Sequence, residues 1–409
     1  MNVDKLNVYF RFGAQEELVG QLVRDGREIL FKYSDDYLEY GSNISPLKLD
    51  FTDRVQVGPA NPFKGLFGVF ADSLPDAWGY LLMKKYLNKK GIAMETLGTL
   101  DHLAFVGDNG LGALLYKPTT GDWATEAKEV DLDYLNTNVQ EVLQGASGKI
   151  IDELFEKGGS PGGARPKIYA CYNPSDDLLT YGSYTLQGGY EHWIVKFAAT
   201  VDANDIANIE LAYYYMALDA GLLMSESKLF TGLSGKKYFG TKRFDRIEDE
   251  RLHMISAAGL LHDDYERSQL DYGILMQQGR ELIGTAKVLG QLLLRAAFNI
   301  FTHNRDDHSK NFAFLMDTSG QWELAPSYDL LFSSSSQGQH STTCAGNGVD
   351  PGSKELLELA EHFSVKNGKE IIERAKGTVS RWDEFAEQAE VSKGSRVPIG
   401  KVIHSLIKK

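Results

Sequence analysis

Residues 303–311, HNRDDHSKN, form a short polar stretch between two parts of the chain that are predicted to be regular secondary structure. The apolar-rich run TAKVLGQLLLRAAFNIFTHN before it predicts a long helix, and NFAFLMD and QWELAPS after it predict a strand pair joined by the turn TSG. A polar loop between apolar elements is typical of a functional site. Asp306 and Asn311 are five residues apart, which is the separation of the base and the magnesium-binding Asn in a protein-kinase catalytic loop.

A second carboxylate, Asp329 in LAPSYDLL, follows the second strand of the predicted pair. Because a hairpin returns its second strand beside the first, Asp329 is predicted to lie near Asn311, where both would bind one divalent cation. His303 and His308 have no third His or Cys at ligand spacing, which argues against a zinc site. The loop therefore predicts phosphoryl transfer, with Asp306 accepting the proton of a substrate hydroxyl.

The Gly-rich run GGSPGGARPK, at 158–167, precedes a predicted strand and is suited to bring backbone amides close to phosphate. Its Lys167 comes four residues after Gly163 and is not followed by Ser or Thr, so the spacing does not favour a Walker NTPase. Lys196, in the predicted strand HWIVKF, is the candidate cation for the α and β phosphates, and Glu210 is its candidate ion-pair partner. Each element alone is also explained by an ordinary turn or strand; their order along the chain indicates a kinase.

The bulk composition limits the classes of function. The chain has 409 residues, which suits two or three domains, and a formal net charge of −13, which repels nucleic-acid backbones and anionic membranes. Its two cysteines, Cys171 and Cys344, fit a reducing cytoplasm, and the sequence has no run of about 18 apolar residues that would predict a membrane span. We therefore expect a cytoplasmic protein that has no membrane contact and that reaches nucleic acid mainly indirectly, through a partner.

Three parts are predicted along the chain. Residues 1–118 alternate in LNVYFRF, ELVGQLVRDG and REILFKYS and then form a helix in SLPDAWGYLLMKKYLNKKG, which predicts an α+β module with an antiparallel sheet. Residues 119–245 hold the Gly-rich loop and Lys196, and residues 246–409 are mostly helical. The Ser-, Gly- and Thr-rich residues 333–353 predict a mobile loop. The predicted fold class is α+β, a protein-kinase-like two-lobed fold with a mostly helical C-terminal lobe.

Four segments resemble a known family: Asn304-x-Asp306-x-His308-x-Lys310-Asn311-Phe312, Ala325-Pro326-x-Tyr328-Asp329, Lys242-Arg243-Phe244-Asp245-Arg246 and Ser160-x-Gly162-Gly163-Ala164-x-x-Lys167. They are similar to the signature segments of HipA-type serine/threonine kinases, which are bacterial toxins. FADSLPDAWG and the later GLGAL resemble the family's N-terminal domain, so the resemblance covers nearly the whole chain.

The resemblance implies a role for each matched residue. Asp306 would be the catalytic base, Asn311 and Asp329 the ligands of Mg²⁺, and Lys196 the contact to the ATP phosphates. Ser160 occupies the place of the family's autophosphorylated serine, whose phosphate would switch the kinase off. The other expected ATP contacts are Gly162, Gly163, Ala164, Arg165, Pro166 and Lys167 in the nucleotide loop, Lys242, Arg243 and Phe244 at the adenine, and His308, Lys310 and Tyr328.

The resemblance also implies a function and partners. The protein would be the toxin of a type II toxin–antitoxin pair that phosphorylates a protein, in the best-known branch of the family an aminoacyl-tRNA synthetase. A small helix-turn-helix antitoxin, HipB-like, would neutralise it and bring it to operator DNA. Two alternatives stay open: a kinase-like co-repressor module without turnover, and a kinase for a small molecule. The presence of the expected base, metal ligands and lysine favours an active protein kinase.

Overall fold

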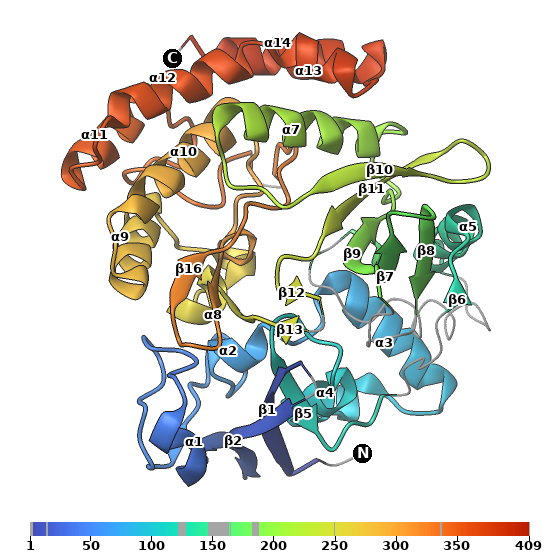
Figure 1. Cartoon of the computed structure of the whole chain (residues 1–409), viewed down its shortest axis with the longest axis vertical. Helices are drawn as coiled ribbons and strands as arrows, with labels where there is room; N and C mark the ends of the chain where they lie inside the picture. The colour runs from blue at the N-terminus through green and yellow to red at the C-terminus, as the bar shows by residue number, and fades with distance from the viewer. Residues whose placement is uncertain are drawn as a thin grey trace. The chain divides into compact units, whose positions relative to one another are not determined.

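A computed structural model describes residues 3–13, 15–121, 128–145, 163, 165–181, 188–248, 250–335 and 338–408. The chain divides into two compact units, and each is described by itself. The first unit holds Met1–Asp202, Lys228–Ile255 and Met316–Gly320, and the second holds Ala203–Ser227, Ser256–Leu315 and Gln321–Lys409. Figure 1 labels their helices and strands.

The N-terminal part of the first unit is a five-stranded antiparallel sheet in the order β4-β3-β2-β1-β5. Strand β1 alternates, so that Leu6, Val8 and Phe10 are buried on one face. This confirms the predicted sheet and the helix that follows it. The elements are β1 (Lys5–Phe12), β2 (Gln15–Asp25), β3 (Glu28–Tyr33), α1 (Asp35–Tyr40), β4 (Gln56–Val57), α2 (Gly68–Ala71), α3 (Ala77–Lys89), η1 (Met94–Thr96), α4 (Thr99–Val106) and β5 (Leu114–Lys117).

A six-stranded sheet in the order β10-β11-β9-β7-β8-β6 forms the rest of the first unit. Its elements are β6 (Lys128–Glu129), α5 (Leu132–Leu143), β7 (Lys167–Asn173), β8 (Leu178–Tyr181), β9 (Glu191–Lys196), β10 (Ser227–Thr231) and β11 (Lys237–Lys242). The short strands β12 (Arg246–Ile247) and β13 (Glu250–Arg251) pair with each other, and β14 (His253–Ser256) leads to the second unit.

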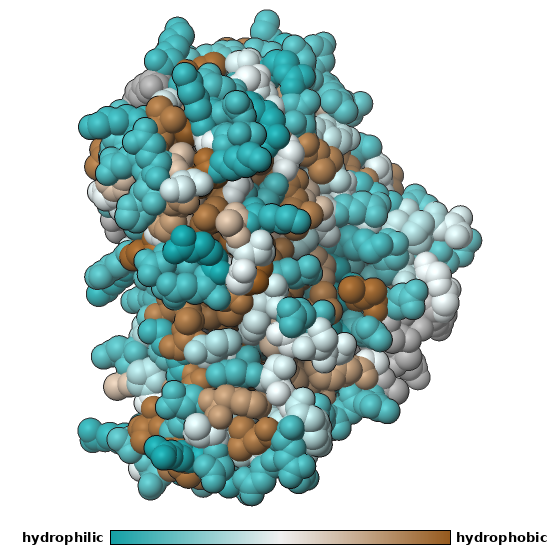
Figure 2. Space-filling view, turned by 60° about the vertical axis from the view of Figure 1, so that its left-hand side comes forward, coloured by the Kyte–Doolittle hydropathy of each residue, from teal (hydrophilic) through white to brown (hydrophobic). Residues whose placement is uncertain are grey.

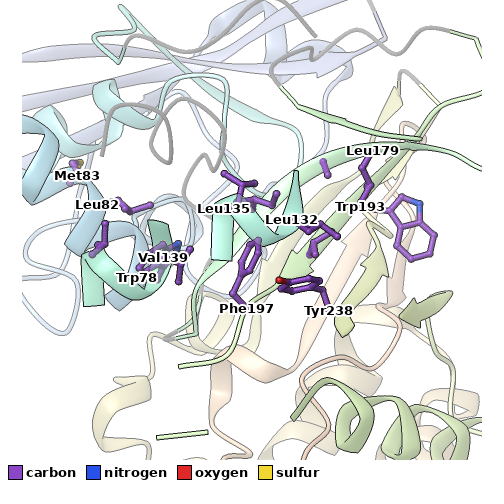
Figure 3. Packing of buried hydrophobic residues seen from close by; sticks show 14 of the residues in the cluster. Trp78, Leu82, Met83, Leu132, Leu135, Val139, Leu179, Trp193, Phe197 and Tyr238 are labelled. Atoms are coloured by element: carbon purple, nitrogen blue, oxygen red, sulfur yellow. The ribbon is translucent and has the colours of Figure 1, made fainter. Parts of the chain in front are cut away.

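One apolar core joins this sheet to two helices, as Figure 3 shows. Trp78 and Leu82 come from α3, Leu135 from α5, and Trp193 and Val195 from β9, and all five side chains are almost completely buried. Each fully buried Leu or Val contributes roughly 1.5–3 kcal/mol. The predicted boundary near residue 118 therefore falls inside one compact unit, because α3 precedes it and the sheet follows it.

The second unit is mostly helical and is built around α10. From Leu292 to Phe301 every residue of this helix is buried, and it packs against α9 and α12. A helix that is buried all round is typical of the centre of a helical unit. The elements are α7 (Ile206–Ala220), α8 (Ala257–Leu261), η2 (Tyr265–Arg267), α9 (Tyr272–Ile283), α10 (Lys287–Phe301), η3 (Ser309–Asn311), β15 (Ala313–Met316), β16 (Trp322–Leu324), α11 (Ser353–His362), α12 (Gly368–Val379), α13 (Trp382–Gln388) and α14 (Lys393–Leu406).

The predicted α+β class, with an antiparallel N-terminal sheet and a mostly helical C-terminal lobe, is confirmed. On the face shown in Figure 2, hydrophilic residues predominate and hydrophobic ones are scattered among them. Of the helices within the described ranges, none combines the length and the apolar character needed to cross a bilayer.

Candidate active site

The polar loop 303–311 leaves α10 and is held beside a second segment of the chain. His303 has a left-handed backbone (φ 58°), and its ring stacks on Phe332 with 4.9 Å between centroids. The Ser333 amide donates to the His303 carbonyl (3.0 Å), and the Arg305 amide donates to the Ser333 carbonyl (3.1 Å). Burial lowers the pKa of His303 to about 4, so its ring is neutral near pH 7. These contacts fix the start of the loop.

The two adjacent aspartates of the loop have opposite environments. The side chain of Asp306 is 61% exposed, and His308 Nε2 lies 3.9 Å from its carboxylate. Asp307 is completely buried, and its carboxylate accepts hydrogen bonds from Tyr272 and His340 and from two backbone amides. Only Asp306 is accessible to a substrate hydroxyl. The surroundings thus agree with the five-residue spacing in favouring Asp306 as the base.

Asn311 and Asp329 come from backbone segments that contact each other. Asn311 is 6% exposed, and its Nδ2 donates to the Asp306 carbonyl (2.7 Å), which turns its amide oxygen away from that carbonyl. The Tyr328 hydroxyl donates to the Lys310 carbonyl (2.6 Å), so the residue before Asp329 touches the residue before Asn311. The hairpin of β15 and β16 therefore brings the backbone segments that carry Asn311 and Asp329 next to each other, as the sequence predicts.

Asp329 has a left-handed backbone (φ 51°), a conformation that non-glycine residues adopt rarely, although Asp, Asn and His adopt it more often than the others. Asn304 Nδ2 lies 3.5 Å from the Asp329 carbonyl, and the Arg295 guanidinium donates to the Tyr328 carbonyl (2.7 Å). A carboxylate and an amide oxygen form the kind of donor set that suits Mg²⁺, which keeps several waters and binds phosphate oxygens as well. The residue types and their proximity fit a magnesium ion.

Tyr265, in η2, contacts two of the residues predicted to bind ATP. Its ring lies 5.8 Å from the His308 ring, and Lys310 Nζ lies 4.3 Å from its centroid. Asp263 Oδ2 accepts from the Ser309 hydroxyl at 2.5 Å. The turn before α9 thus contacts three consecutive residues of the loop. The sequence analysis missed Tyr265 and Asp263, since they precede the loop by roughly 40 residues and belong to no motif.

In the first unit, β7 and β9 place two lysines directly opposite each other. The antiparallel register pairs Lys167 with Lys196, and residues paired in this way point to the same face of a sheet. Trp193 and Val195 alternate to the other face, which is the apolar core. Lys196 Nζ lies 5.6 Å from the centroid of the Phe239 ring. Two ammonium groups on one face create a positive potential that suits phosphate.

Gly163, a described residue of the Gly-rich loop, lies close to the ammonium group of Lys167. Its φ of 101° requires glycine, and a Cβ added there would lie 2.5 Å from Lys167 Nζ. The Gly163 amide donates to Asp76 Oδ2 (2.6 Å), just before α3. Three predicted residues of this loop lie outside the described residues: Ser160, Gly162 and Ala164.

Other predicted ATP contacts have partners within the first unit. Arg165 makes a two-pronged ion pair with Asp202, with Nε and Nη2 each 3.0 Å from a carboxylate oxygen. The Pro166 carbonyl accepts from the Phe197 amide (2.8 Å). These contacts hold the chain directly before β7 against the chain after β9, and the predicted ATP contacts of Arg165 and Pro166 stay predictions.

Lys242 lies on a different face of the sheet from Lys196. The register pairs Lys242 with Trp193, and its Nζ is 2.6 Å from Glu191 Oε1. Phe244 is half-buried and follows the sheet. The structure therefore does not bring the Lys242 side chain to the face of Lys167 and Lys196, and its predicted adenine contact stays a prediction.

Glu210 is buried on α7, in the second unit, whereas Lys196 belongs to the first. Its pairing with Lys196 likewise stays a prediction.

Comparison with protein families assigns most of the chain. The family model described as the HipA-like C-terminal domain matches residues 159–384, more than half of the sequence, and the HipA N-terminal domain matches residues 11–117. The chain belongs to the HipA family. This confirms the resemblance found in its motifs.

Solved structures were compared as well, while no curated protein matches the sequence. The protein is similar to a chain in the complex of the Shewanella oneidensis MR-1 toxin–antitoxin system HipA, HipB and its operator DNA, with a TM-score of 0.68 and 17% identity over 98% of this chain and 96% of that one. At this identity the match shows the fold. The Helicobacter pylori proinflammatory kinase CtkA matches 53% of this chain and 91% of its own, with 15% identity and a TM-score of 0.32.

In this HipA protein, the two matched regions meet in a buried charged cluster of the first unit. Asp245 accepts from Arg243 (2.8 and 2.9 Å), Arg246 (2.8 Å) and the Gly112 amide (2.7 Å). Arg246 also donates to the carbonyls of Gly110 and Gly112. Burial alone would raise the pKa of Asp245, but the two guanidinium groups hold it well below its usual range. Arg243, predicted to contact adenine, is thus a member of this cluster.

Proposed function

We propose that this HipA-family protein is an ATP-dependent serine/threonine protein kinase and the toxin of a type II toxin–antitoxin system. The supporting observation is the contrast within the loop. Asp306 is exposed, while the residues on its C-terminal side that fix its backbone, Asp307 and Asn311, are buried. Phosphoryl transfer asks the protein mainly for positioning and charge stabilisation, and an accessible carboxylate on a fixed backbone suits that task.

In the proposed reaction, Asp306 accepts the proton of a serine or threonine hydroxyl and orients its oxygen. Asn311 and Asp329 would hold Mg²⁺, which when bound offsets the negative charge of the ATP phosphates. Lys196, together with Lys167 beside it, would contact those phosphates. Ser160 would be autophosphorylated, which would add about two negative charges beside the nucleotide and inactivate the kinase.

The proposed partners follow from the family and from charge. The Shewanella structure contains HipA, HipB and operator DNA. We infer that this protein binds a small helix-turn-helix antitoxin of the HipB kind, and that it reaches DNA through that antitoxin, because its net charge of −13 opposes direct contact. A protein, such as an aminoacyl-tRNA synthetase, is the proposed target.

The test is transfer of phosphate from labelled ATP in the presence of Mg²⁺, with the phosphosites mapped by mass spectrometry. Asp306→Asn should lower transfer by about 10²–10⁴-fold, because it removes the base, and should leave stability within about 0.5 kcal/mol, because the side chain is exposed. Asp25→Asn, the same change at an exposed strand end, is the control and should retain parental transfer. Parental transfer that requires Mg²⁺ and labels Ser160 would support the proposal. Absence of transfer to the protein itself and to a lysate would overturn it.

A further inference from the structure

We propose that Asp307 and His340 are positioning residues of the active site, which hold the backbone on both sides of Asp306 and connect it to the backbone of Asp329. The inference rests on the proposed kinase function, since it assigns these residues a role through the base. Neither residue is in a position to react, because both are buried: Asp307 is 0% exposed and His340 is 5% exposed.

The carboxylate of Asp307 is surrounded by hydrogen-bond donors. Oδ2 accepts from the Tyr272 hydroxyl (2.8 Å) and faces His340 Nδ1 (2.9 Å), and Oδ1 accepts from the amides of Ser341 (2.9 Å) and Thr342 (3.2 Å). An ionised carboxylate only accepts hydrogen bonds, so Nδ1 of His340 carries the proton in this arrangement. Four donors on one buried carboxylate leave it a single low-energy orientation.

The segment around His340 also bonds the backbone on either side of Asp306. The Ser341 amide and hydroxyl donate to the Arg305 carbonyl (3.2 and 3.1 Å), and the Thr342 hydroxyl donates to the Asp307 carbonyl. The residues directly before and after Asp306 are therefore both fixed, while its own side chain points out to solvent. This arrangement orients the base without burying it.

A chain of side-chain bonds continues from Asp307 to the metal-ligand segment. The Tyr272 hydroxyl donates to Asp307 and accepts from Asn299 Nδ2 (2.9 Å). Asn299 Oδ1 accepts from Asn304 Nδ2 (3.0 Å), which also lies 3.5 Å from the Asp329 carbonyl. Burial and the nearby Asp307 raise the pKa of Tyr272 well above its usual value, so its hydroxyl stays a donor. The base and one proposed metal ligand thus share one buried polar network.

A positioning role for His340 and a purely structural role predict different experimental results. If His340 only stabilised the fold, its loss would lower the melting temperature and leave the activity of each folded molecule unchanged. If it positions the base, its loss frees the loop locally and lowers kcat, while helices outside the loop, such as α12 and α14, keep the exchange rates of the parent. The two roles are therefore separable by measurement.

The experiment compares His340→Ala, His340→Asn and the control His362→Ala, an exposed histidine on α11. In asparagine, Nδ2 is bonded to Cγ as Nδ1 is in histidine, so His340→Asn keeps a donor toward Asp307. Amide hydrogen exchange is measured by mass spectrometry on peptides that cover 303–312 and on peptides from α12 and α14. Kinase kcat and the dissociation constant for ATP are measured on the same samples.

The expected result is local. His340→Ala should speed amide exchange in 303–312 and lower kcat by about 10- to 100-fold, which corresponds to the loss of one hydrogen bond to a buried charge. His340→Asn should restore both, and His362→Ala should match the parent. Unchanged exchange in the loop, equal acceleration in α12 and α14, or an Asn variant as impaired as Ala would overturn the inference. If the parent transfers no phosphate, the proposed function fails, and the exchange data still decide whether these residues fix the loop.

Discussion

Asp245→Asn is expected to destabilise the first unit strongly, although it changes one atom. The carboxylate accepts four hydrogen bonds from Arg243, Arg246 and Gly112, and all three charged side chains are at most 6% exposed. An amide would keep one acceptor and present its own N–H groups to guanidinium donors. Removing one partner of a buried ion pair costs about 3–5 kcal/mol, because the remaining charges stay buried without compensation.

The assay is urea unfolding followed by fluorescence and circular dichroism. With a denaturant slope of about 3 kcal/mol per molar, the transition of the first unit should move by about 1–1.7 M urea. Asp177→Asn is the matched control, since its pair with Lys228 (3.6 Å) has an 83% exposed carboxylate and should cost at most about 1 kcal/mol. Equal small shifts for both variants would refute the assignment of Asp245 as a stabilising centre.

The pH dependence gives a second check on the same residue. Because Arg243 and Arg246 lower the pKa of Asp245, its stabilisation is complete above the unfolded carboxyl pKa of about 3.9 and is lost as pH falls toward the lower folded value. The difference in stability between the parent and Asp245→Asn should therefore be constant from pH 7 to pH 5, and should shrink only below about pH 4. A difference that changes between pH 7 and pH 5 would contradict this cause.

Three further changes test other parts of the molecule. Lys196→Met should reduce kcat/KM for ATP by about 10-fold or more, while the exposed Lys236→Met should not; equal kcat/KM for both would remove Lys196 from the site. Asp329→Asn should raise the Mg²⁺ concentration needed for half-maximal transfer by at least about 10-fold, because even the loss of a residue that only hydrogen-bonds to a metal ligand weakens metal binding by that factor. An unchanged Mg²⁺ titration would exclude Asp329 as a ligand. Burial lowers the pKa of His253 to about 4, so protonation of the unfolded chain below its pKa of about 6.5 should remove about 3 kcal/mol of stability as the pH falls from 6.5 to 4. His253→Gln, which keeps a donor for the Ile44 carbonyl, should remove that part of the slope, and a slope identical to the parent's would refute it.

Features that depend on neighbouring residues were predictable from the sequence. The alternation of β1 and its following strands identified the N-terminal sheet, because a half-buried strand repeats every two residues. The apolar run before residue 303 predicted α10, and the hairpin after it predicted that Asp329 returns toward Asn311. The five-residue spacing to Asn311 favoured Asp306 over Asp307 as the base, and that assignment stays a prediction.

Features that depend on long-range contacts were not predictable in this way. His340 is 33 residues from Asp307, and nothing local indicates that its ring is buried against a carboxylate. In its described residues, the predicted mobile loop 333–353 is hydrogen-bonded to the loop 303–311: the amides of Ser341 and Thr342 donate to Asp307, and Arg305 donates to the Val349 carbonyl. The face on which Lys242 lies depends on strand register, since a shift by one residue reverses every side chain.

The core shared by α3, α5 and the six-stranded sheet has a consequence for how a newly made chain folds. The apolar side chains of α3, such as Trp78 and Met83, are synthesised well before their partners Trp193 and Val195. Roughly 110 residues separate Met83 from Val195, which a ribosome adds in about 5–20 s. Until β9 has been made, the sheet that covers the apolar face of α3 is incomplete, and this apolar surface exposes the nascent protein to aggregation and to capture by chaperones.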